Sequence, residues 1–581
     1  MRTPPADLRL CYIQRPPPVI PVLRNAQGYF PSMEVLFPSL VDETSGSPSL
    51  AAAELAVDVS ADGAVATVEH IVTKARRSVP IWLRPMHLVE PLNYLEGDYV
   101  LPSDGALPAS RGPWQRTLRK INDPYNEAYT DAVFACMASR LVETGRSPHW
   151  CRFYGTVNGR IAEYRYNITE DMEDIEDEKW FHDGLKKGLF SMIVEDIDNP
   201  SVASAFLPAR GSPTREAMDG DAGSSHDSIS IAESLESGAG HGVSAVDTAG
   251  ELEEGEPELS DEKAEVHQPR VRIGASRRSG SDNGDGDSDE SSYDGLIYKA
   301  VFKDFPAQVT VIERCDGTMD DLMEAEIDEE ATADMRDTKE QRWTAWIFQV
   351  VAALAVAQQS YDFVHNDLHT NNVMWCGTGE THLYYHVTGG AGGDRYYKVP
   401  TYGRIFKIID FGRATFRPPT LGDNHLWMPD AYAPGADAGG QYNCAPYFEQ
   451  GKPKVQPNRS FDLCRLAVAI LDTLWDEEPA TATPSKVLTR EPGRVQHETT
   501  SPLWNLLWLW LTDKDGKNVL RDPEDNERYP EFDLYCAIAR DVHNAVPAQQ
   551  LTLPLFDTAF RCRRKDVPAD TTIWKLTATS R

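Results

Sequence analysis

The sequence predicts an α+β fold with two lobes, a small β-rich N-terminal lobe and a larger, mainly helical C-terminal lobe. Three observations predict it. Alternating apolar patterns typical of strands come early in the chain, and long apolar runs with helical spacing come late. Between them, residues 201–294 consist mainly of Ser, Gly, Asp and Glu. The chain of 581 residues is long enough for one large domain that carries an insertion in its first lobe.

Composition excludes several classes of function. Asp and Glu outnumber Lys and Arg by 90 to 57, so the formal net charge is −33 and nucleic acid is not an expected partner. The longest apolar runs, which begin at Ile347 and Leu503, are too short to span a bilayer. The nine cysteines lack the spacing of a zinc site, which favours a reducing compartment. We expect a soluble protein that does not bind membranes.

Two segments are expected to lie outside the lobes. Residues 1–50 form a proline-rich N-terminal extension. Residues 201–294 cannot bury enough apolar surface to offset the entropy cost of ordering them. We therefore predict a long disordered acidic insertion there.

Residues 51–200 are predicted to form the first part of the N-terminal lobe. Apolar residues alternate on both sides of Asp62-Gly63, which predicts a β-hairpin, and residues 79–83 predict a further strand. Helical apolar spacing then ends at Gly145, a natural C-terminal cap.

The second lobe begins shortly after the insertion. Residues 295–317 complete the N-terminal lobe and the hinge, and residues 318–581 form the C-terminal lobe. A long helix is predicted to open at Thr338 with a capping box to Gln341. One apolar face of this helix is expected in the core: Trp343, Trp346, Ile347, Val350 and Leu354.

Two motifs in the C-terminal lobe carry the chemistry. HNDLHTNN places Asp367 and Asn372 five residues apart, so that a carboxylate can meet a substrate hydroxyl while an amide oxygen holds a metal ion. IIDFG places Asp410 after a short strand, where it can coordinate the magnesium ion of a nucleotide. Either motif alone also fits an aspartate that caps its own turn. In this order, the two predict phosphate transfer.

The sequence resembles the serine/threonine protein kinases encoded by giant double-stranded DNA viruses of amoebae and algae. The matching stretches are INDPYNEAYTDAVF, FVHNDLHTNNVM, VPTYGRIFKIIDFGRA, QYNCAPYF, PNRSFDLCRLA and ERYPEFDLYCAIARDVH. The resemblance implies a bilobal protein-kinase-like fold with ATP and Mg²⁺ as cofactors. It also implies a viral protein in the host cell cytoplasm, with packaging in the virion as an alternative.

The resemblance also implies roles for individual residues. Asp367 would be the catalytic aspartate, and Asn372 and Asp410 would be the magnesium ligands. Asp462 would support the catalytic loop, because an acid in an apolar helix needs internal hydrogen-bond partners. The hinge beside the adenine would consist of Glu313, Arg314 and Cys315.

His369 is a further catalytic candidate. It stands where many protein kinases have a lysine near the transferred phosphate. HNDLH is also similar to small-molecule kinases such as aminoglycoside and choline kinases, which keeps a second class of substrate open. The alternative is that His369 only packs or caps a turn.

The residues predicted to bind the nucleotide depart from the usual pattern. The resemblance places Arg84 at the position of the strand lysine and Asp131 at that of its partner carboxylate, with Glu127 one turn away. Arginine can grip phosphate in a fork geometry, but it is not interchangeable with lysine. The alternative is that Arg84 and Asp131 lie on solvated surfaces and that Lys74 or Lys120 takes the lysine position.

Two further departures concern the loops. The hairpin at Asp62-Gly63 contains no GxGxxG motif that could cover the phosphates. Asn366 replaces the arginine that commonly precedes the catalytic aspartate and binds an activation-loop phosphate. We therefore do not expect switching by phosphorylation at the candidate sites Thr415, Thr420 and Tyr432.

We expect a serine/threonine protein kinase that transfers the γ-phosphate of ATP to protein substrates during viral infection. Two alternatives stay open. A pseudokinase that acts as a binding scaffold is favoured by the missing glycine-rich loop, and a small-molecule kinase is favoured by HNDLH. The acidic insertion is expected to contact other virion or host proteins.

Overall fold

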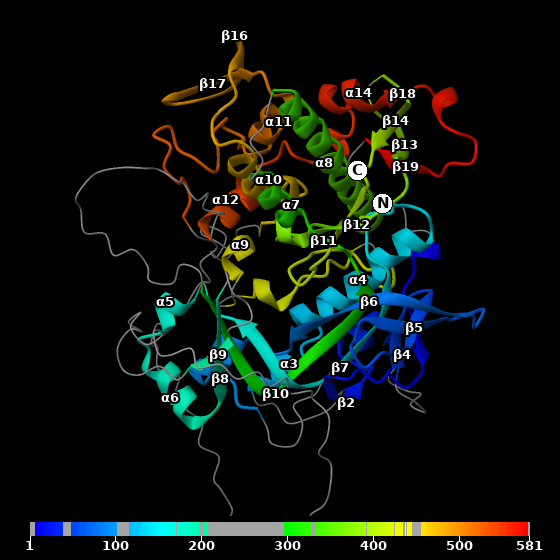
Figure 1. The fold of residues 1–581 in the computed structure, drawn as a ribbon, viewed down its shortest axis with the longest axis vertical. Coiled ribbons are helices and arrows are strands. Elements are labelled where there is room, and N and C mark those ends of the chain that lie inside the picture. Colours follow the sequence, from blue (N-terminus) through cyan, green and yellow to red (C-terminus); the bar gives the residue numbers. More distant parts are fainter. Residues whose placement is uncertain are drawn as a thin grey trace, which may run out of the picture. The chain divides into compact units, whose positions relative to one another are not determined.

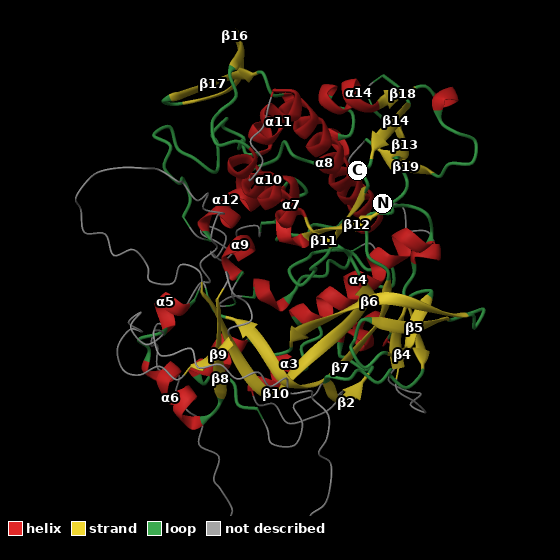
Figure 2. Ribbon diagram, viewed as in Figure 1, coloured by secondary structure: helices red, strands yellow, loops and turns green. Residues whose placement is uncertain are grey.

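The computed structural model describes residues 6–38, 48–101, 116–169, 171–196, 203–206, 296–327, 333–390, 392–422, 424–433, 436, 438–443, 455–530 and 532–578. All of them belong to one compact unit of mixed helices and strands, which confirms the predicted α+β class (Figure 2). Most of the predicted insertion and the last five residues of QYNCAPYF lie outside the described residues.

A large antiparallel sheet combines strands from both sides of the insertion. Its strands follow the order β2-β7-β10-β6-β5-β4, and β8 and β9 continue it beside β10 (Figure 1). Thr310 of β10 lies opposite Arg84 of β6 on one side and Thr156 of β7 on the other. The strands are β2 (Leu23–Gln27), β4 (Glu54–Val59), β5 (Val65–His70), β6 (Arg76–His87), β7 (Phe153–Asn167), β8 (Phe190–Asp196), β9 (Ala203–Phe206) and β10 (Leu296–Glu313). β9 lies inside residues 201–294, which were predicted to be disordered. The start of the predicted insertion is therefore wrong, because the sheet continues into it.

The β4–β5 hairpin confirms the prediction at Asp62-Gly63. Gly63 adopts a φ of +71°, a backbone conformation that suits glycine. The Asp62 carboxylate accepts hydrogen bonds from Ser60 Oγ at 2.5 Å and from the Ala64 N–H at 3.1 Å. The turn is therefore closed by its own side chains.

Helix α4 (Glu127–Glu143) packs on this sheet against β7 and β10. The Asn126 side chain caps it by accepting the Ala128 N–H at 3.0 Å, and Gly145 follows its end with a φ of +67°. Most of its residues are buried, including the polar residues Thr130 and Asp131. The other helices before the insertion are α1 (Ser32–Leu36), α2 (Pro91–Glu96), α3 (Arg116–Ile121), α5 (Met172–Ile175) and α6 (Lys179–Lys187).

The chain after the insertion combines helices with several small sheets. Its longest helix, α8, spans Ala333–Tyr361 and so begins before the predicted capping box at Thr338. The predicted apolar face of α8 is buried, as are Trp504, Trp508 and Trp510 of α11. The remaining helices are α7 (Met319–Ile327), α9 (Gly439–Asn443), α10 (Phe461–Leu474), α11 (Pro502–Trp510), α12 (Asp533–Asp541), α13 (Pro547–Gln550) and α14 (Pro554–Phe560).

Small sheets complete the fold. β11-β12-β15 lies beside the loop of HNDLHTNN, and β18-β14-β13-β19 packs on α8 through β14 and β19. The remaining pairs are β1-β3 and β16-β17. The strands are β1 (Cys11–Gln14), β3 (Pro48–Ala51), β11 (Gly317–Thr318), β12 (Val373–Gly377), β13 (His382–Thr388), β14 (Arg395–Pro400), β15 (Arg404–Ile408), β16 (Thr481–Glu491), β17 (Arg494–Thr499), β18 (Arg561–Cys562) and β19 (Ile573–Thr577).

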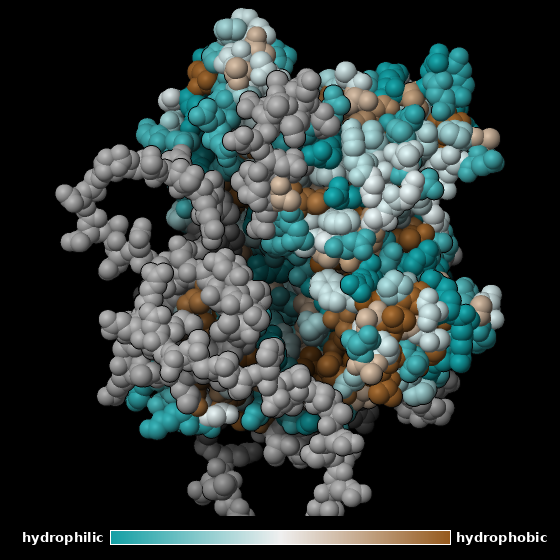
Figure 3. Space-filling view, viewed as in Figure 1, coloured by the Kyte–Doolittle hydropathy of each residue, from teal (hydrophilic) through white to brown (hydrophobic). Residues whose placement is uncertain are grey.

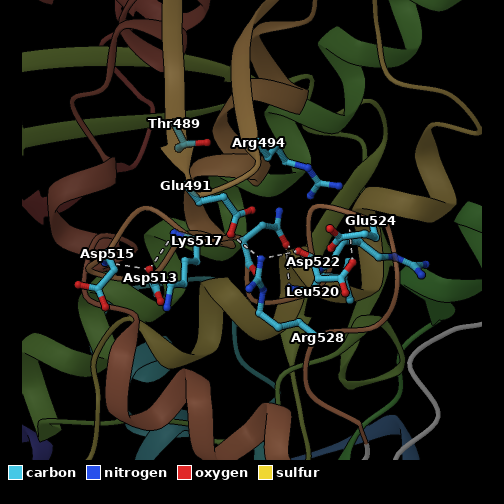
Figure 4. A network of polar contacts seen from close by, with 12 residues as sticks. Thr489, Glu491, Arg494, Asp513, Asp515, Lys517, Leu520, Asp522, Glu524 and Arg528 are labelled. Atoms are coloured by element: carbon cyan, nitrogen blue, oxygen red, sulfur yellow. Dashed lines mark hydrogen bonds and ion pairs between the residues drawn. The ribbon is translucent and has the colours of Figure 1, made fainter.

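A polar network anchors the β16–β17 hairpin (Figure 4). Glu491 is buried and accepts a hydrogen bond from Arg528 at 2.5 Å, and Arg528 Nε also donates to the Asn518 carbonyl at 2.6 Å. Asp513 and Asp522 accept backbone N–H groups of their own loops. These acidic residues therefore stabilise loops.

The face seen in Figure 3 is mainly polar, with apolar residues gathered over the sheet near β6 and β7. Across the described residues, none of the helices combines the length and the apolar character needed to cross a membrane.

Candidate functional site

The Asp462 side chain holds the backbone of the loop that carries Asp367. Asp462 lies in the first turn of α10, is fully buried, and accepts the backbone N–H groups of His365 and Asn366 at 3.0 Å. Burial raises the pKa of Asp462 to about 6, although these N–H groups favour its charged form. His365 also contacts the Ile409 carbonyl at 2.8 Å, which ties the loop to the IIDFG strand. The backbone partners expected for Asp462 are thus present.

Asp367 is held by residues far away in the sequence. Tyr535 of α12 donates its hydroxyl to the Asp367 carboxylate at 2.7 Å, and Arg465 Nε donates to the Tyr535 oxygen at 3.0 Å. Burial alone would raise the pKa of Asp367, but the charges of Arg413, His369 and Arg465 outweigh it and lower the pKa to about 2. The Asp367 carboxylate is therefore ionised near neutral pH.

Asn372 and His369 face each other on the same loop. Asn372 Nδ2 lies 2.9 Å from the Asp367 carbonyl oxygen and 3.0 Å from His369 Nε2. Burial lowers the pKa of His369, so its ring can accept this hydrogen bond in the neutral form. Both contacts use the Asn372 amide nitrogen, and the amide oxygen is the atom that suits a metal ion.

Arg84 joins two carboxylates at the edge of the sheet. It contacts Asp131 of α4 at 2.5 Å and Asp410 at 2.7 Å. Asp131 also accepts the Phe411 N–H at 2.7 Å. The side chains of Arg84 and Asp131 are only 11% and 2% exposed, so the alternative of a solvated surface pair is wrong.

The Asp410 carboxylate is 41% exposed, and its backbone has a φ of +67°, which is uncommon for a residue with a side chain. Burial raises its pKa, but the nearby Arg84 guanidinium outweighs burial and lowers the pKa below the usual value. Asp410 is thus an ionised carboxylate that reaches solvent.

The lysines considered as alternatives to Arg84 lie elsewhere. Lys74 is an exposed residue that pairs with Glu69 at 3.6 Å. Lys120 pairs with Asp430 at 2.8 Å and with Glu90 at 3.7 Å. Neither lysine lines the pocket that contains Arg84.

A small recess, partly open to solvent, lies beside this ion pair, and we call it the pocket. It is bounded by β6, α4, β10 and the IIDFG segment that follows β15, and it contains both apolar and charged side chains. Its lining residues are Arg84, Asp131, Ala135, Cys151, Thr310, Ile312, Ile409, Asp410 and Phe411.

The predicted hinge residues directly follow Ile312 of the pocket wall. The Glu313 side chain pairs with Lys407 at 2.7 Å and accepts the Arg152 N–H at 3.1 Å, so it is engaged in structural contacts. Arg314 is exposed. Cys315 lies 3.6 Å, sulfur to sulfur, from Cys151 of the pocket.

Asn366 organises the segment after IIDFG. Its amide nitrogen donates to the Arg413 carbonyl at 3.0 Å, and its amide oxygen accepts from Tyr442 and Gln441. Thr415 is fully buried, and Tyr432 is buried with its hydroxyl bonded to the Arg413 carbonyl at 2.6 Å. These two candidate modification sites are therefore enclosed.

Sequence reasoning missed Tyr535, Arg465 and Arg413 as neighbours of Asp367. Tyr535 and Arg465 stand in stretches on which the predicted resemblance was based, but no local spacing marks them as partners of a loop more than 90 residues away in the chain. Arg413 directly follows IIDFG in the chain, so its position near the site could be inferred from the sequence.

No protein-family model matches the chain, and no curated protein matches it either. Within the described residues, no group of three or more His, Cys, Asp or Glu side chains is arranged to hold a metal ion. The site must therefore be judged from its own geometry.

Removing the Tyr535 hydroxyl is expected to destabilise the protein. Tyr535→Phe deletes a hydrogen bond to the partly buried Asp367 carboxylate and leaves Arg465 without this acceptor, which should cost about 1.5–3 kcal/mol. The free energy of unfolding in urea measures the effect. Tyr529→Phe, at a half-buried tyrosine of the same segment, is the control and should change stability little. Equal stability of the two variants would contradict the assigned role of Tyr535.

Glu127 at the start of α4 should make stability depend on pH. Burial, followed by the negative charge of Glu90, raises the pKa of Glu127 to about 8, although Lys120 and Arg413 act against the shift. Asp430 also faces it and raises the pKa further. Below the unfolded-state pKa both states are protonated, but as pH rises towards 8 the unfolded state loses its proton first, so stability falls.

Glu127→Gln should therefore be less sensitive to pH than the unchanged protein between pH 5 and pH 8. Urea unfolding at several pH values in this range measures the difference. Glu163→Gln, at an exposed glutamate of β7, serves as the control and should keep the original pH profile. Parallel profiles for Glu127→Gln and the unchanged protein would refute the buried protonated form.

Proposed function

We propose that this chain is an ATP-dependent phosphotransferase with a bilobal protein-kinase-like fold, which phosphorylates serine and threonine hydroxyl groups of proteins during viral infection. The observation that carries the proposal is the contact of Arg84 with both Asp131 of α4 and Asp410 of IIDFG at one end of a pocket. A strand cation paired with a helix carboxylate, next to a metal-binding aspartate, is the arrangement that kinases need for transfer.

The residues present fit a magnesium nucleotide. Magnesium in such sites keeps water and phosphate ligands and takes only one or two protein ligands. Asp410 offers an ionised, partly exposed carboxylate, and Asn372 offers its amide oxygen. We place the adenine ring against the apolar side chains of Ala135, Ile312 and Ile409, in a recess that must widen to admit it. When bound, the metal would offset the charge of the phosphates.

The chain's own residues supply the remaining chemistry. Asp367 is ionised, so it can accept a hydrogen bond from an acceptor hydroxyl and take its proton. Tyr535 donates a hydrogen bond to one oxygen of that carboxylate and so restricts its rotation. Arg84 has two guanidinium nitrogens directed at carboxylates, and a phosphate could replace the Asp410 contact.

Transfer from γ-labelled ATP tests the proposal, with generic proteins, sugars, amines and lipids as acceptors. Labelled serine or threonine in the protein acceptors supports it. Labelling of the small molecules alone would show that the protein-kinase proposal is wrong and that HNDLH marks a small-molecule kinase.

A pseudokinase is the second candidate, and the β4–β5 turn favours it. The hairpin has no glycine-rich motif, and its turn is closed by the Asp62 carboxylate. It therefore offers no cradle of backbone N–H groups for phosphate. Binding of a fluorescent ATP analogue without any transfer would favour the pseudokinase.

We place the protein in the host cell cytoplasm or the virion, and cell fractionation during infection tests this.

A further inference from the structure

Three cysteines from separate parts of the chain lie near one another, and one of them, Cys151, lines the pocket. Cys151 precedes β7, Cys315 follows β10, and Cys376 lies on β12. The sulfur atoms of Cys151 and Cys315 are 3.6 Å apart, and the Cys376 sulfur lies 3.8 Å from the Arg314 carbonyl oxygen. Arg314 directly precedes Cys315 in the chain, so the Cys376 sulfur also lies close to Cys315. Cys315 is therefore the middle member of the group.

Backbone hydrogen bonds hold Cys315 between its two neighbours. On one side, the Glu313 N–H donates to the Arg152 carbonyl at 2.9 Å, next to Cys151. On the other side, the Asp316 N–H donates to the Trp375 carbonyl at 2.9 Å, next to Cys376. The closeness of the thiols thus follows from the way the strands are joined.

The surroundings favour reaction among these thiols. Cys151 belongs to a small apolar cluster with Ile312, Met374 and Ile409, separate from the main core, and Cys315 packs against it. Cys315 and Cys376 are only partly buried and can meet a small oxidant. The nearby Cys315 thiol lowers the pKa of Cys376, and the Lys407 cation adds to this effect.

We propose that Cys151, Cys315 and Cys376 form a modification site at which hydrogen peroxide produces a reversible disulfide that contains Cys315. The two sulfur atoms of a disulfide are about 2.0 Å apart, so Cys151 and Cys315 need to approach by only about 1.6 Å. Because Cys151 lines the pocket, the disulfide would alter the pocket wall. The proposal does not depend on what the pocket binds.

The chemistry balances with peroxide as the oxidant. The Cys376 thiolate attacks one peroxide oxygen, the O–O bond breaks, and Cys376 becomes a sulfenic acid while hydroxide leaves. The Cys315 sulfur attacks the Cys376 sulfur, and the sulfenic oxygen leaves as water with the Cys315 proton. Cys151 can then attack the Cys315 sulfur and release Cys376 as a thiol. In total, two thiols and one peroxide give one disulfide and two waters.

Mass spectrometry of the full chain after peroxide treatment tests this. We expect a cross-linked peptide pair that contains Cys315, lighter by two hydrogens and restored by dithiothreitol. Cys315→Ser should abolish it, and Cys376→Ser should slow its formation by at least about tenfold. Cys562→Ser, at a partly buried cysteine on β18, is the control and should leave it unchanged.

Two results would contradict the proposed disulfide. Absence of any Cys315 disulfide in the treated protein would overturn the proposal, and so would a Cys151–Cys376 disulfide that forms in Cys315→Ser as fast as the Cys315 disulfide forms in the unchanged protein. Thermal unfolding of each reduced variant checks that it folds, and Cys315→Ala replaces Cys315→Ser if the serine is not tolerated. Because no nucleotide takes part, this result is separate from success or failure of the kinase assay.

Discussion

Asp367→Asn is expected to lower phosphate transfer by about 10²- to 10⁴-fold, the range that a positioned general base contributes. The amide cannot take the proton of an acceptor hydroxyl. It can still accept the hydrogen bond of the Tyr535 hydroxyl, so the loop should keep its conformation. Initial rates with γ-labelled ATP measure the loss, and binding of a fluorescent ATP analogue should change little.

Asp58→Asn is the control for this experiment, because Asp58 is an exposed aspartate of β4 far from the loop in sequence. It should keep the original rate. Transfer that survives in Asp367→Asn would refute the role of Asp367. A protein without measurable transfer in its unchanged form would point to the pseudokinase instead.

The pH dependence of stability and of the transfer rate also tests the role of Asp367. Its pKa of about 2 lies below the unfolded-state value, so the ionised carboxylate contributes stability that is present above that value and is lost as pH falls through about 2. Between pH 5 and pH 8 its charge is constant. Any change in transfer rate across this range must therefore arise from another group, and His369 at the same loop is one candidate.

Local patterns predicted the elements that hold the site. The hairpin at Asp62-Gly63 and the helix that ends at Gly145 were recognisable because turn and cap residues have distinct backbone requirements. The start of α8 was predicted too late, at Thr338, because a capping box can also occur inside a helix. Local signals locate elements better than their ends.

Long-range contacts were only partly predictable. Arg84 and Asp131 could be paired because the resemblance placed both, and Asp462 could be placed because a buried acid requires partners. The contact of Tyr535 with Asp367 and that of Cys151 with Cys315 join positions more than 150 residues apart and leave no periodic signal. Burial of Thr415 follows from the same tertiary packing.

Arg84→Met is expected to cost about 3–5 kcal/mol of stability, because it leaves the buried Asp131 carboxylate beside Asp410 without a cation. Urea unfolding measures the loss. Arg77→Met is the matched control on the same strand. Its ion pair with Glu54 is half exposed, so the change should cost about 0–1 kcal/mol. Similar losses in both variants would contradict the buried role of Arg84.

A double variant separates the structural role of Arg84 from its chemical role. Arg84→Met with Asp131→Asn removes the unpaired charge, and the asparagine oxygen can still accept the Phe411 N–H, so much of the lost stability should return. If binding of the ATP analogue returns as well, the ion pair serves only the fold. If the double variant is stable but still fails to bind the analogue, Arg84 contacts the nucleotide itself, because the fold no longer explains the loss.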